Sequence, residues 1–86
     1  MASRRLPSLK ALRSFEAAAR HGSFSRAATE LSVTHAAISH QIRALEEDLG
    51  AALFHRTGRH VELTERGEKL LAVLTIAFDQ MAEAWH

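Results

Sequence analysis

The sequence predicts a mostly α-helical fold in which a three-helix core carries a β-hairpin wing and is followed by one long helix. Three observations lead to this prediction. Residues 25–50 contain two short helical patterns joined by a tight turn, and residues 53–63 contain two short β-prone runs around a glycine. No helix breaker occurs from Glu68 to His86. Together these features are typical of a winged helix-turn-helix with an extra C-terminal helix.

The first helix is expected to start after Ser8, whose hydroxyl suits an N-cap, and to run to about Arg20, with Gly22 just past its end. Its spacing of apolar residues predicts an inner face that packs in the core. The residues of this face are Leu9, Leu12, Phe15 and Ala19.

Ser25 is a candidate N-cap for a second helix over 26–31, in which Ala27 and Ala28 are small enough for another helix to pack closely. Ser32 and Val33 then form the turn.

The third helix is predicted to begin after Thr34, a favourable N-cap, and to end at Gly50. One side of this helix carries an apolar stripe, and the opposite side is small and polar in its first two turns, where a surface helix usually carries Lys and Glu. Such a side can approach base edges in a DNA groove and still offer hydrogen bonds. The stripe is Ile38, Ile42, Leu45 and Leu49, and the opposite side holds Ala36, Ser39, His40 and Arg43.

The wing is predicted from strands over 53–56 and 61–63, with the reversal at 57–60. Thr64 can cap the last helix, which at about 20 residues would be about 30 Å long. Its apolar face is too broad for one small core to cover, so we expect it to pair with a second copy of the chain. The expected dimerisation residues are Leu70, Leu74, Ala77, Phe78, Met81 and Trp85.

Length and composition exclude several classes. The 86 residues fit one domain, and the absence of cysteine excludes disulfides and thiolate metal sites. No secretory signal or membrane-spanning run is visible, and the polar face of the last helix carries acids rather than the basic residues that lipid surfaces favour. The net charge is only +1, but seven basic and two acidic residues precede Glu46, whereas four basic and eight acidic residues lie from there onward. The helix-turn-helix therefore lies largely in the basic part.

No catalytic, metal or cofactor motif stands out. His35 and His40 are five residues apart and diverge around a helix, and only His55 and His60, across the hairpin, have a spacing that lets them face each other. The sequence has no glycine-rich phosphate loop and no serine elbow, and residues 46–48 are interpreted as a solvated acidic face. We therefore expect neither an enzyme nor a cofactor.

Several segments carry a family resemblance: SFSRAATEL, SVTHAAISHQIRALEEDLG and ALFHRTGRHVELTERGEKLL. In this order they resemble the N-terminal domain of LysR-type transcriptional regulators. LPSLKALRSFEAAARHGSFSRAA is most similar to the branch that includes the regulators of glycine cleavage and of inducible β-lactamase. The resemblance implies a winged helix-turn-helix over 1–63 and a linker helix over 64–86 through which two copies pair.

The same resemblance implies a bacterial, cytoplasmic DNA-binding protein whose small-molecule effector binds a C-terminal domain that is absent from this sequence. It leaves open whether two dimers join as a tetramer. The start of the third helix is implied to contact bases, and many relatives have Gln, Pro and Arg at positions 35, 36 and 40. The implied base contacts are Thr34, His35, Ala36, Ser39 and His40.

Other residues are expected at the DNA backbone or in the wing. Arg43 is interpreted as a phosphate contact, with an ion pair to Glu46 or Glu47 as the alternative. The family wing implies that Arg59 reaches a minor groove, and a solvated turn arginine is the alternative. The full set is Ser25, Gln41, Arg43, Arg56 and Arg59. The sequence therefore predicts a sequence-specific DNA-binding domain; the alternative is a winged-helix module for protein assembly whose DNA binding is incidental.

Overall fold

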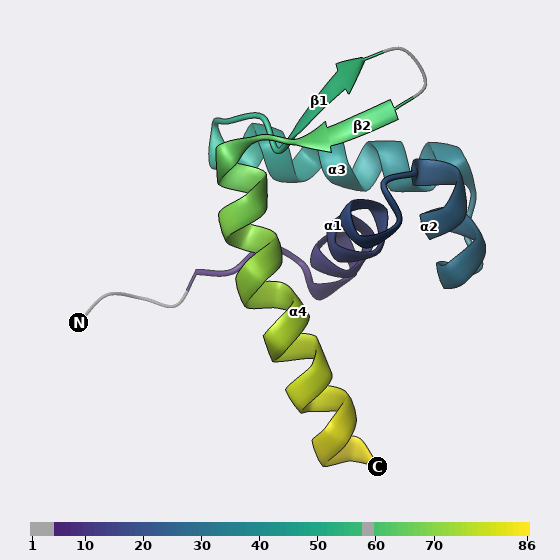
Figure 1. Cartoon of the computed structure of the whole chain (residues 1–86), viewed down its shortest axis with the longest axis vertical. Coiled ribbons are helices and arrows are strands. Elements are labelled where there is room, and N and C mark those ends of the chain that lie inside the picture. The colour runs from purple at the N-terminus through teal and green to yellow at the C-terminus, as the bar shows by residue number, and fades with distance from the viewer. Residues whose placement is uncertain (1–4, 58–59) are drawn as a thin grey trace.

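The computed structural model describes residues 5–57 and 60–86. Three helices form a compact core, a two-stranded wing lies across one end of it, and a long fourth helix runs down one side and projects beyond it (Figure 1). The predicted mostly helical, winged architecture is confirmed. The elements are α1 (Leu9–His21), α2 (Phe24–Leu31), α3 (His35–Leu49), β1 (Phe54–Thr57), β2 (His60–Leu63) and α4 (Glu65–Trp85).

The first helix, α1, lies at the centre of the core and packs against α2, α3 and α4. Ser8 caps it as predicted, since its hydroxyl accepts a hydrogen bond from the backbone N–H of Ala11 (3.0 Å). Phe15 is fully buried, but Leu9, predicted on the inner face, is 54% exposed. Leu9 is the first residue of the helix, where the chain has not yet entered the core.

The second helix begins two residues earlier than predicted. Its N-cap is Ser23, which accepts a hydrogen bond from the N–H of Arg26 (3.1 Å), so Ser25 lies inside the first turn. Ala27 and Ala28 are buried, which confirms that small side chains allow close helix packing here. Ser32 ends the helix with a φ of 56°, a left-handed conformation that reverses the chain toward α3.

The third helix is held by its apolar stripe. Thr34 caps it, and its hydroxyl accepts a hydrogen bond from the N–H of Ala37 (3.0 Å). Ile38 and Ile42 are fully buried, whereas Leu49, the predicted end of the stripe, is 41% exposed. The stripe therefore fixes the first three turns, and the last turn extends beyond the core.

The wing is an antiparallel pair in which Phe54 faces Leu63 and Thr57 faces His60. Both strands differ by one residue from the predicted ranges, because Leu53 belongs to the buried connection before β1 and His60 already pairs. The Phe54 ring packs against those of Phe15 and Phe24, with centroids 5.3 and 5.4 Å apart. These aromatic contacts attach the wing to the core.

The fourth helix is capped by Thr64, which accepts a hydrogen bond from the N–H of Gly67 (3.1 Å). Its first half lies against the core, where Leu74 is buried, and its second half carries exposed apolar side chains. The Thr75 hydroxyl lies 3.4 Å from the Glu16 carboxylate of α1. Among the described residues, no helix has the length and apolarity that crossing a bilayer requires.

A charged network joins α1 to α2. Arg20 donates hydrogen bonds to both Glu16 and Glu30, at 2.8–2.9 Å. These bonds raise the pKa of Arg20 above its usual range. Arg20, and after it His21, lower the pKa of Glu30 from 4.5 to about 2. The network thus keeps Arg20 and Glu30 charged at neutral pH and fixes α2 beside α1.

We predict that Gly67→Ala destabilises the fold by about 1–3 kcal/mol through overpacking. A Cβ at this position would overlap the backbone oxygen of Leu53 and lie 2.9 Å from a methyl group of Leu63. Where a helix interior leaves room for a side chain, replacing glycine by alanine instead stabilises the fold by about 1 kcal/mol. The sign of the change in the free energy of unfolding therefore shows whether residue 67 is tightly packed. Urea unfolding of both proteins measures it, and a stabilised variant would contradict the close approach of α4 to the connection before β1.

We predict that the contribution of Glu30 to stability depends on pH. Because the pKa of Glu30 is lowered in the folded state, its stabilisation is present above about pH 4.5 and is lost as the pH falls toward 2. Since Glu30 is partly exposed, Glu30→Gln should lower the free energy of unfolding by only about 1 kcal/mol at pH 7.

The difference between the two proteins should shrink toward zero near pH 2. Urea unfolding across this range measures it, with Glu83→Gln, on the exposed end of α4, as the control that should change little at any pH. An equal difference at pH 7 and pH 2.5 would contradict the network.

Candidate nucleic-acid interface

The outward side of α3 is exposed and small at its start. Ala36, His40 and Arg43 are all exposed, in successive turns of a helix whose other side is buried. No ion pair in the described part of the chain involves Arg43. The predicted alternative, a pair with Glu46 or Glu47, is therefore absent from the described residues, and the guanidinium is available to a ligand.

Ser39 does not lie in the middle of this outward side. It is half-buried and turned toward the wing; His35, one turn earlier, is exposed and turned the same way. Gln41 is also half-buried, at the flank of the helix. Thr34 is exposed, and its hydroxyl, although it accepts the capping bond, retains an O–H that can donate.

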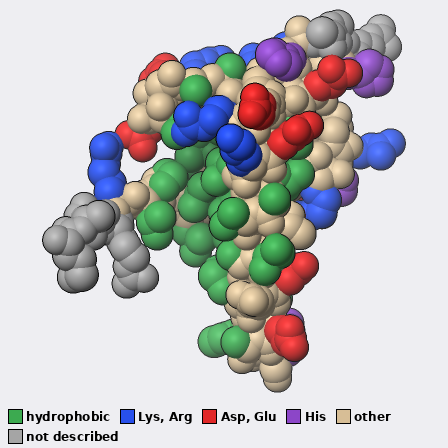
Figure 2. Space-filling view, turned by 60° about the vertical axis from the view of Figure 1, so that its left-hand side comes forward, with side chains coloured by type: hydrophobic (Ala, Val, Ile, Leu, Met, Phe, Trp, Pro, Cys, Tyr) green, Lys and Arg blue, Asp and Glu red, His purple; other side chains and the backbone are tan. Residues whose placement is uncertain are grey.

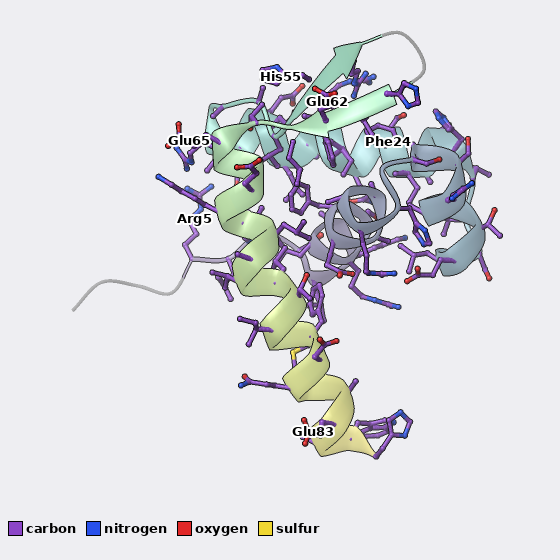
Figure 3. All side chains as sticks on the ribbon, in the orientation of Figure 1. Arg5, Phe24, His55, Glu62, Glu65 and Glu83 are labelled. Atoms are coloured by element: carbon purple, nitrogen blue, oxygen red, sulfur yellow. The ribbon has the colours of Figure 1, made fainter. Side chains whose placement is uncertain are left out.

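A pocket of about 370 Å³ with a mixed polar and apolar lining lies between the wing, the start of α2 and the start of α3. Phe24 forms part of its wall and lies beneath the wing (Figure 3). Among the residues that the structure describes, no carboxylate lines the pocket. We call it the wing pocket and define it by Phe24, Ser25, His35, Ser39, Arg56 and His60.

The side chains of Arg56 and His35 both lie against the ring of Phe24. The guanidinium of Arg56 lies 5.4 Å from the centroid of its ring, and the His35 ring lies 5.9 Å from it at 46°. The structure therefore brings Ser25, His35, Ser39 and Arg56 together in one place. Arg59, the predicted minor-groove residue, lies outside the described residues.

In the acidic cluster of α3, Glu47 and Asp48 are exposed as interpreted, but Glu46 is not part of a solvated face. Glu46 is half-buried and accepts hydrogen bonds from the backbone N–H groups of Leu53 and Phe54, at 2.8 and 3.3 Å. Asp48 pairs with Arg5 at 2.8 Å. Glu46 thus holds the connection between α3 and the wing. Within residues 5–57 and 60–86, no group of three or more His, Asp or Glu side chains is placed to hold a metal ion.

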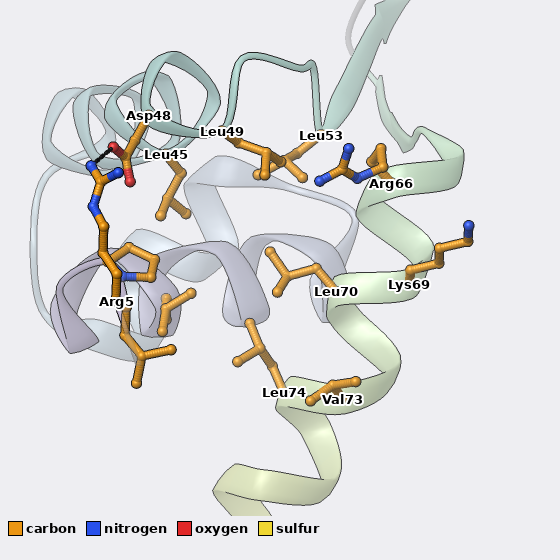
Figure 4. Close-up of a pocket in the computed structure, with 13 residues that line it drawn as sticks. Arg5, Leu45, Asp48, Leu49, Leu53, Arg66, Lys69, Leu70, Val73 and Leu74 are labelled. Atoms are coloured by element: carbon orange, nitrogen blue, oxygen red, sulfur yellow. Dashed lines mark hydrogen bonds and ion pairs between the residues drawn. The ribbon is translucent and has the colours of Figure 1, made fainter. Parts of the chain in front are cut away.

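A second surface is apolar. Figure 2 shows hydrophobic side chains gathered along α4 and the adjoining core. A groove of about 520 Å³ runs between α4 and the end of α3, with Arg5, Arg66 and Lys69 among its lining residues (Figure 4). From the groove to its end, the helix leaves four large apolar side chains exposed, with Val73 and Ile76 on one side and Met81 and Trp85 on another. We call this broad surface the exposed α4 face: Val73 (64% exposed), Ile76 (61%), Met81 (50%) and Trp85 (86%).

The predicted dimerisation residues divide between this face and the core. Leu74 is 7% exposed and belongs to the domain's own core, which corrects its assignment to a dimer contact. Leu70 and Phe78 are partly buried against that core, and Ala77 is half-buried. Met81 and Trp85 lie on the exposed face.

Sequence reasoning missed several residues of both surfaces. Val73 and Ile76 belong to the apolar pattern of α4, and only the position of the core shows that they face outward. Phe24 and His60 gave no signal of a shared pocket, since they are far apart in the sequence. Ser25 is the predicted N-cap of α2, whereas Ser23, two residues earlier, caps the helix in the structure.

The geometry is shared with solved regulator structures. The structure matches that of a CbnR_DBD-DNA complex with a TM-score of 0.81 at 32% sequence identity, over 91% of this chain and 90% of that one. The similarity therefore extends over the helices, the wing and the long last helix.

Curated relatives match at higher sequence identity. The chain is 61% identical over 74 residues to the HTH-type transcriptional activator AmpR of Pseudomonas aeruginosa, covering 86% of this chain and 25% of that protein. It is 55% identical over 82 residues to the glycine cleavage system transcriptional activator of Escherichia coli K12, covering 95% and 27%. The chain spans about a quarter of the length of these relatives.

The predicted branch is thus confirmed by relatives of both kinds that it named. The model of the bacterial regulatory helix-turn-helix proteins of the lysR family matches residues 9–68, which run from the start of α1 to the first turn of α4. The chain therefore belongs to the LysR family of bacterial regulatory helix-turn-helix proteins.

Proposed function

We propose that this chain is the DNA-binding domain of a bacterial LysR-type transcriptional regulator, which binds operator half-sites as a homodimer. In this proposal α3 enters the major groove and the wing reaches the adjacent minor groove. The observation that carries it is the exposed start of α3, which is small, free of acidic side chains and rigidly held by Ile38 and Ile42 beneath it. A helix placed in this way can bring its side chains to base edges.

The residues of α3 divide into two proposed roles. Ala36 and His40 lie on the outward side, where an alanine can contact a thymine methyl group and a histidine can donate to a guanine. Thr34 is exposed at the N-cap of the helix, and His35 and Ser39 flank this side toward the wing. Arg43, one turn beyond His40, is placed to contact a phosphate, with Gln41 at the flank.

Homodimerisation is supported by the exposed α4 face. Four large apolar side chains lie on a helix that continues beyond the core, and water contact with such a surface is unfavourable. The same face of a second copy covers it most simply, because identical surfaces meet across a two-fold axis. A two-fold dimer in turn sets the spacing of two half-sites on the DNA.

The rest of the proposal concerns the whole regulator. Its relatives are transcriptional regulators, and we propose the same non-enzymatic role here, in the bacterial cytoplasm. Because the chain spans about a quarter of their length, we assign effector binding and any tetramer contacts to the remainder of such a protein. Residues 1–63 then form the DNA-binding unit and residues 64–86 the linker helix.

We predict that His40→Ala weakens binding to a duplex selected from a random pool by about 1–3 kcal/mol and relaxes preference at one base pair of each half-site. The loss should be much smaller on an unselected duplex, because the contact is to a base. Titration of labelled duplexes measures both affinities. The control is His86→Ala, which removes the same side chain from the far end of α4.

Equal losses on selected and unselected duplexes would reassign His40 to the backbone. If His40→Ala and His86→Ala both bind DNA like the unaltered protein while one of them no longer binds a partner protein, the results favour the alternative of a protein-assembly module.

We predict that Ile76→Glu and Met81→Glu each convert the dimer to monomers. Both side chains are at least half exposed, so the charge should not disturb the core, but it would be buried in the dimer. Sedimentation equilibrium measures the change. Binding to a duplex with two half-sites should weaken far more than binding to one half-site.

The control is Glu68→Lys, which changes the charge at an exposed position of α4 that lies about 80° or more around the helix from all four residues of the exposed α4 face. Glu68→Lys should remain dimeric. If Ile76→Glu and Met81→Glu also remain dimeric, the exposed α4 face is not the dimer interface.

A further inference from the structure

Glu16 is a charged side chain that lies inside the domain. It belongs to α1 and is only 8% exposed, and a carboxylate is rarely buried unless it is paired. Its Oε1 accepts a hydrogen bond from Nη2 of Arg20 and its Oε2 accepts one from Nε of Arg20, both at 2.9 Å. The Thr75 hydroxyl of α4 donates to the same Oε2 at 3.4 Å. One buried carboxylate thus joins α1 to α4.

The hydrogen bonds continue from Arg20 to α2. Its Nη1 and Nη2 donate to the two carboxylate oxygens of Glu30, at 2.9 and 2.8 Å. Since α1 lies between α4 and α2 (Figure 1), these bonds cross the domain from the last helix to the first helix of the helix-turn-helix. We call them the interhelix chain and define it by Thr75, Glu16, Arg20 and Glu30.

The contact of Thr75 with Glu16 differs in kind from the other contacts of α4 with the core. Leu74 is buried, and Leu70 and Phe78 are partly buried against the core. Apolar contacts of this sort are non-directional, so they tolerate some rotation or tilt of a helix. A hydrogen bond requires a narrow range of distance and angle. The buried carboxylate therefore selects one orientation of α4 on α1.

The length of α4 makes this orientation important. The helix continues for ten residues beyond Thr75, to Trp85. Over that length of about 15 Å, a tilt of about 10° moves the end of the helix by roughly 3 Å. The rise of DNA is about 3.4 Å per base pair. If two copies pair through α4, a tilt of this size changes the separation of their α3 helices by about one base pair.

We propose that Glu16 is a positioning residue for DNA recognition. By accepting from Thr75 on α4 and from Arg20 beside α2, it fixes the direction of α4 relative to the helix-turn-helix and thereby the half-site spacing that a dimer accepts. This inference rests on the proposed DNA-binding homodimer. In it Glu16 contacts no DNA and acts only through the helices that it joins.

The first test uses selected duplexes in which the two half-sites are moved by one or two base pairs. For the unaltered protein, a change of one base pair should weaken binding about tenfold, because the dimer holds one separation. Thr75→Val keeps the branched shape and removes the hydroxyl, so this loss should shrink to about threefold or less. Affinity for a single half-site should stay within about twofold, since Thr75 is not a proposed DNA contact.

The matched control is Thr75→Ser, which keeps the hydroxyl and should keep the dependence on spacing. A general loss of stability would lower affinity for every duplex alike and leave that dependence unchanged. Glu16→Gln should relax the dependence as Thr75→Val does, because its amide cannot hold Arg20 as an ion pair. If Glu16→Gln does not fold, Thr75→Val still decides, since Thr75 is only half-buried.

The second test needs no DNA. Within the described residues no hydrogen bond joins Thr75 directly to Glu30, so their effects on stability should add unless the interhelix chain connects them. In Thr75→Val, Glu30→Gln should change the unfolding equilibrium constant about twofold less than in the unaltered protein, because Arg20 is then held less firmly. Urea unfolding at pH 7 measures it. In Arg20→Met the two changes should add.

Three results would overturn the inference. One is an unchanged spacing dependence in Thr75→Val with specific binding retained, which leaves the proposed function standing. A second is additive effects of Thr75→Val and Glu30→Gln on unfolding, which would show that the interhelix chain does not connect α4 to α2. A third is failure to select any duplex, which removes the proposed function and the role in spacing together, whatever the unfolding measurement gives.

Discussion

The arrangement of this domain depends on the burial of one side of α3 against α1. Ile38 and Ile42 are fully buried with Phe15, and burial of each side chain of this size stabilises the fold by about 1.5–3 kcal/mol. Because these residues fix the rotation of α3 about its axis, they also decide that Ala36 and His40 face outward. A rotation of one residue, about 100°, would place charged and apolar side chains on the wrong sides.

Three further sets of contacts fix the elements around α3. The bonds of Arg20 to Glu16 and Glu30 hold α2 beside α1, and the carboxylate of Glu46 holds the connection that leads into the wing. The rings of Phe24 and Phe54 then attach the wing to the core. The outward side of α3 and the wing thereby form one rigid surface, as recognition of DNA in two adjacent grooves requires.

Much of this arrangement was predictable from local patterns. Caps at Ser8, Thr34 and Thr64 and the end of α3 at Gly50 followed from residue type and position, and the structure confirms each of them. The errors have physical causes. Ser23 rather than Ser25 caps α2 because Phe24 must enter the core from the first turn. The wing pocket was not visible at all, because its residues meet only after the chain folds, and the burial of Leu74 depends on where α4 crosses the core.

The account's central claim is that α3 reads the major groove while the wing lies at the minor groove. Methylation interference on a selected duplex tests it directly, since methyl groups at guanine N7 block the major groove and those at adenine N3 block the minor groove. The account predicts N7 interference within two half-sites related by a two-fold axis, with N3 interference beside each of them. Interference at neither N7 nor N3, with binding sensitive only to backbone phosphates, would contradict it.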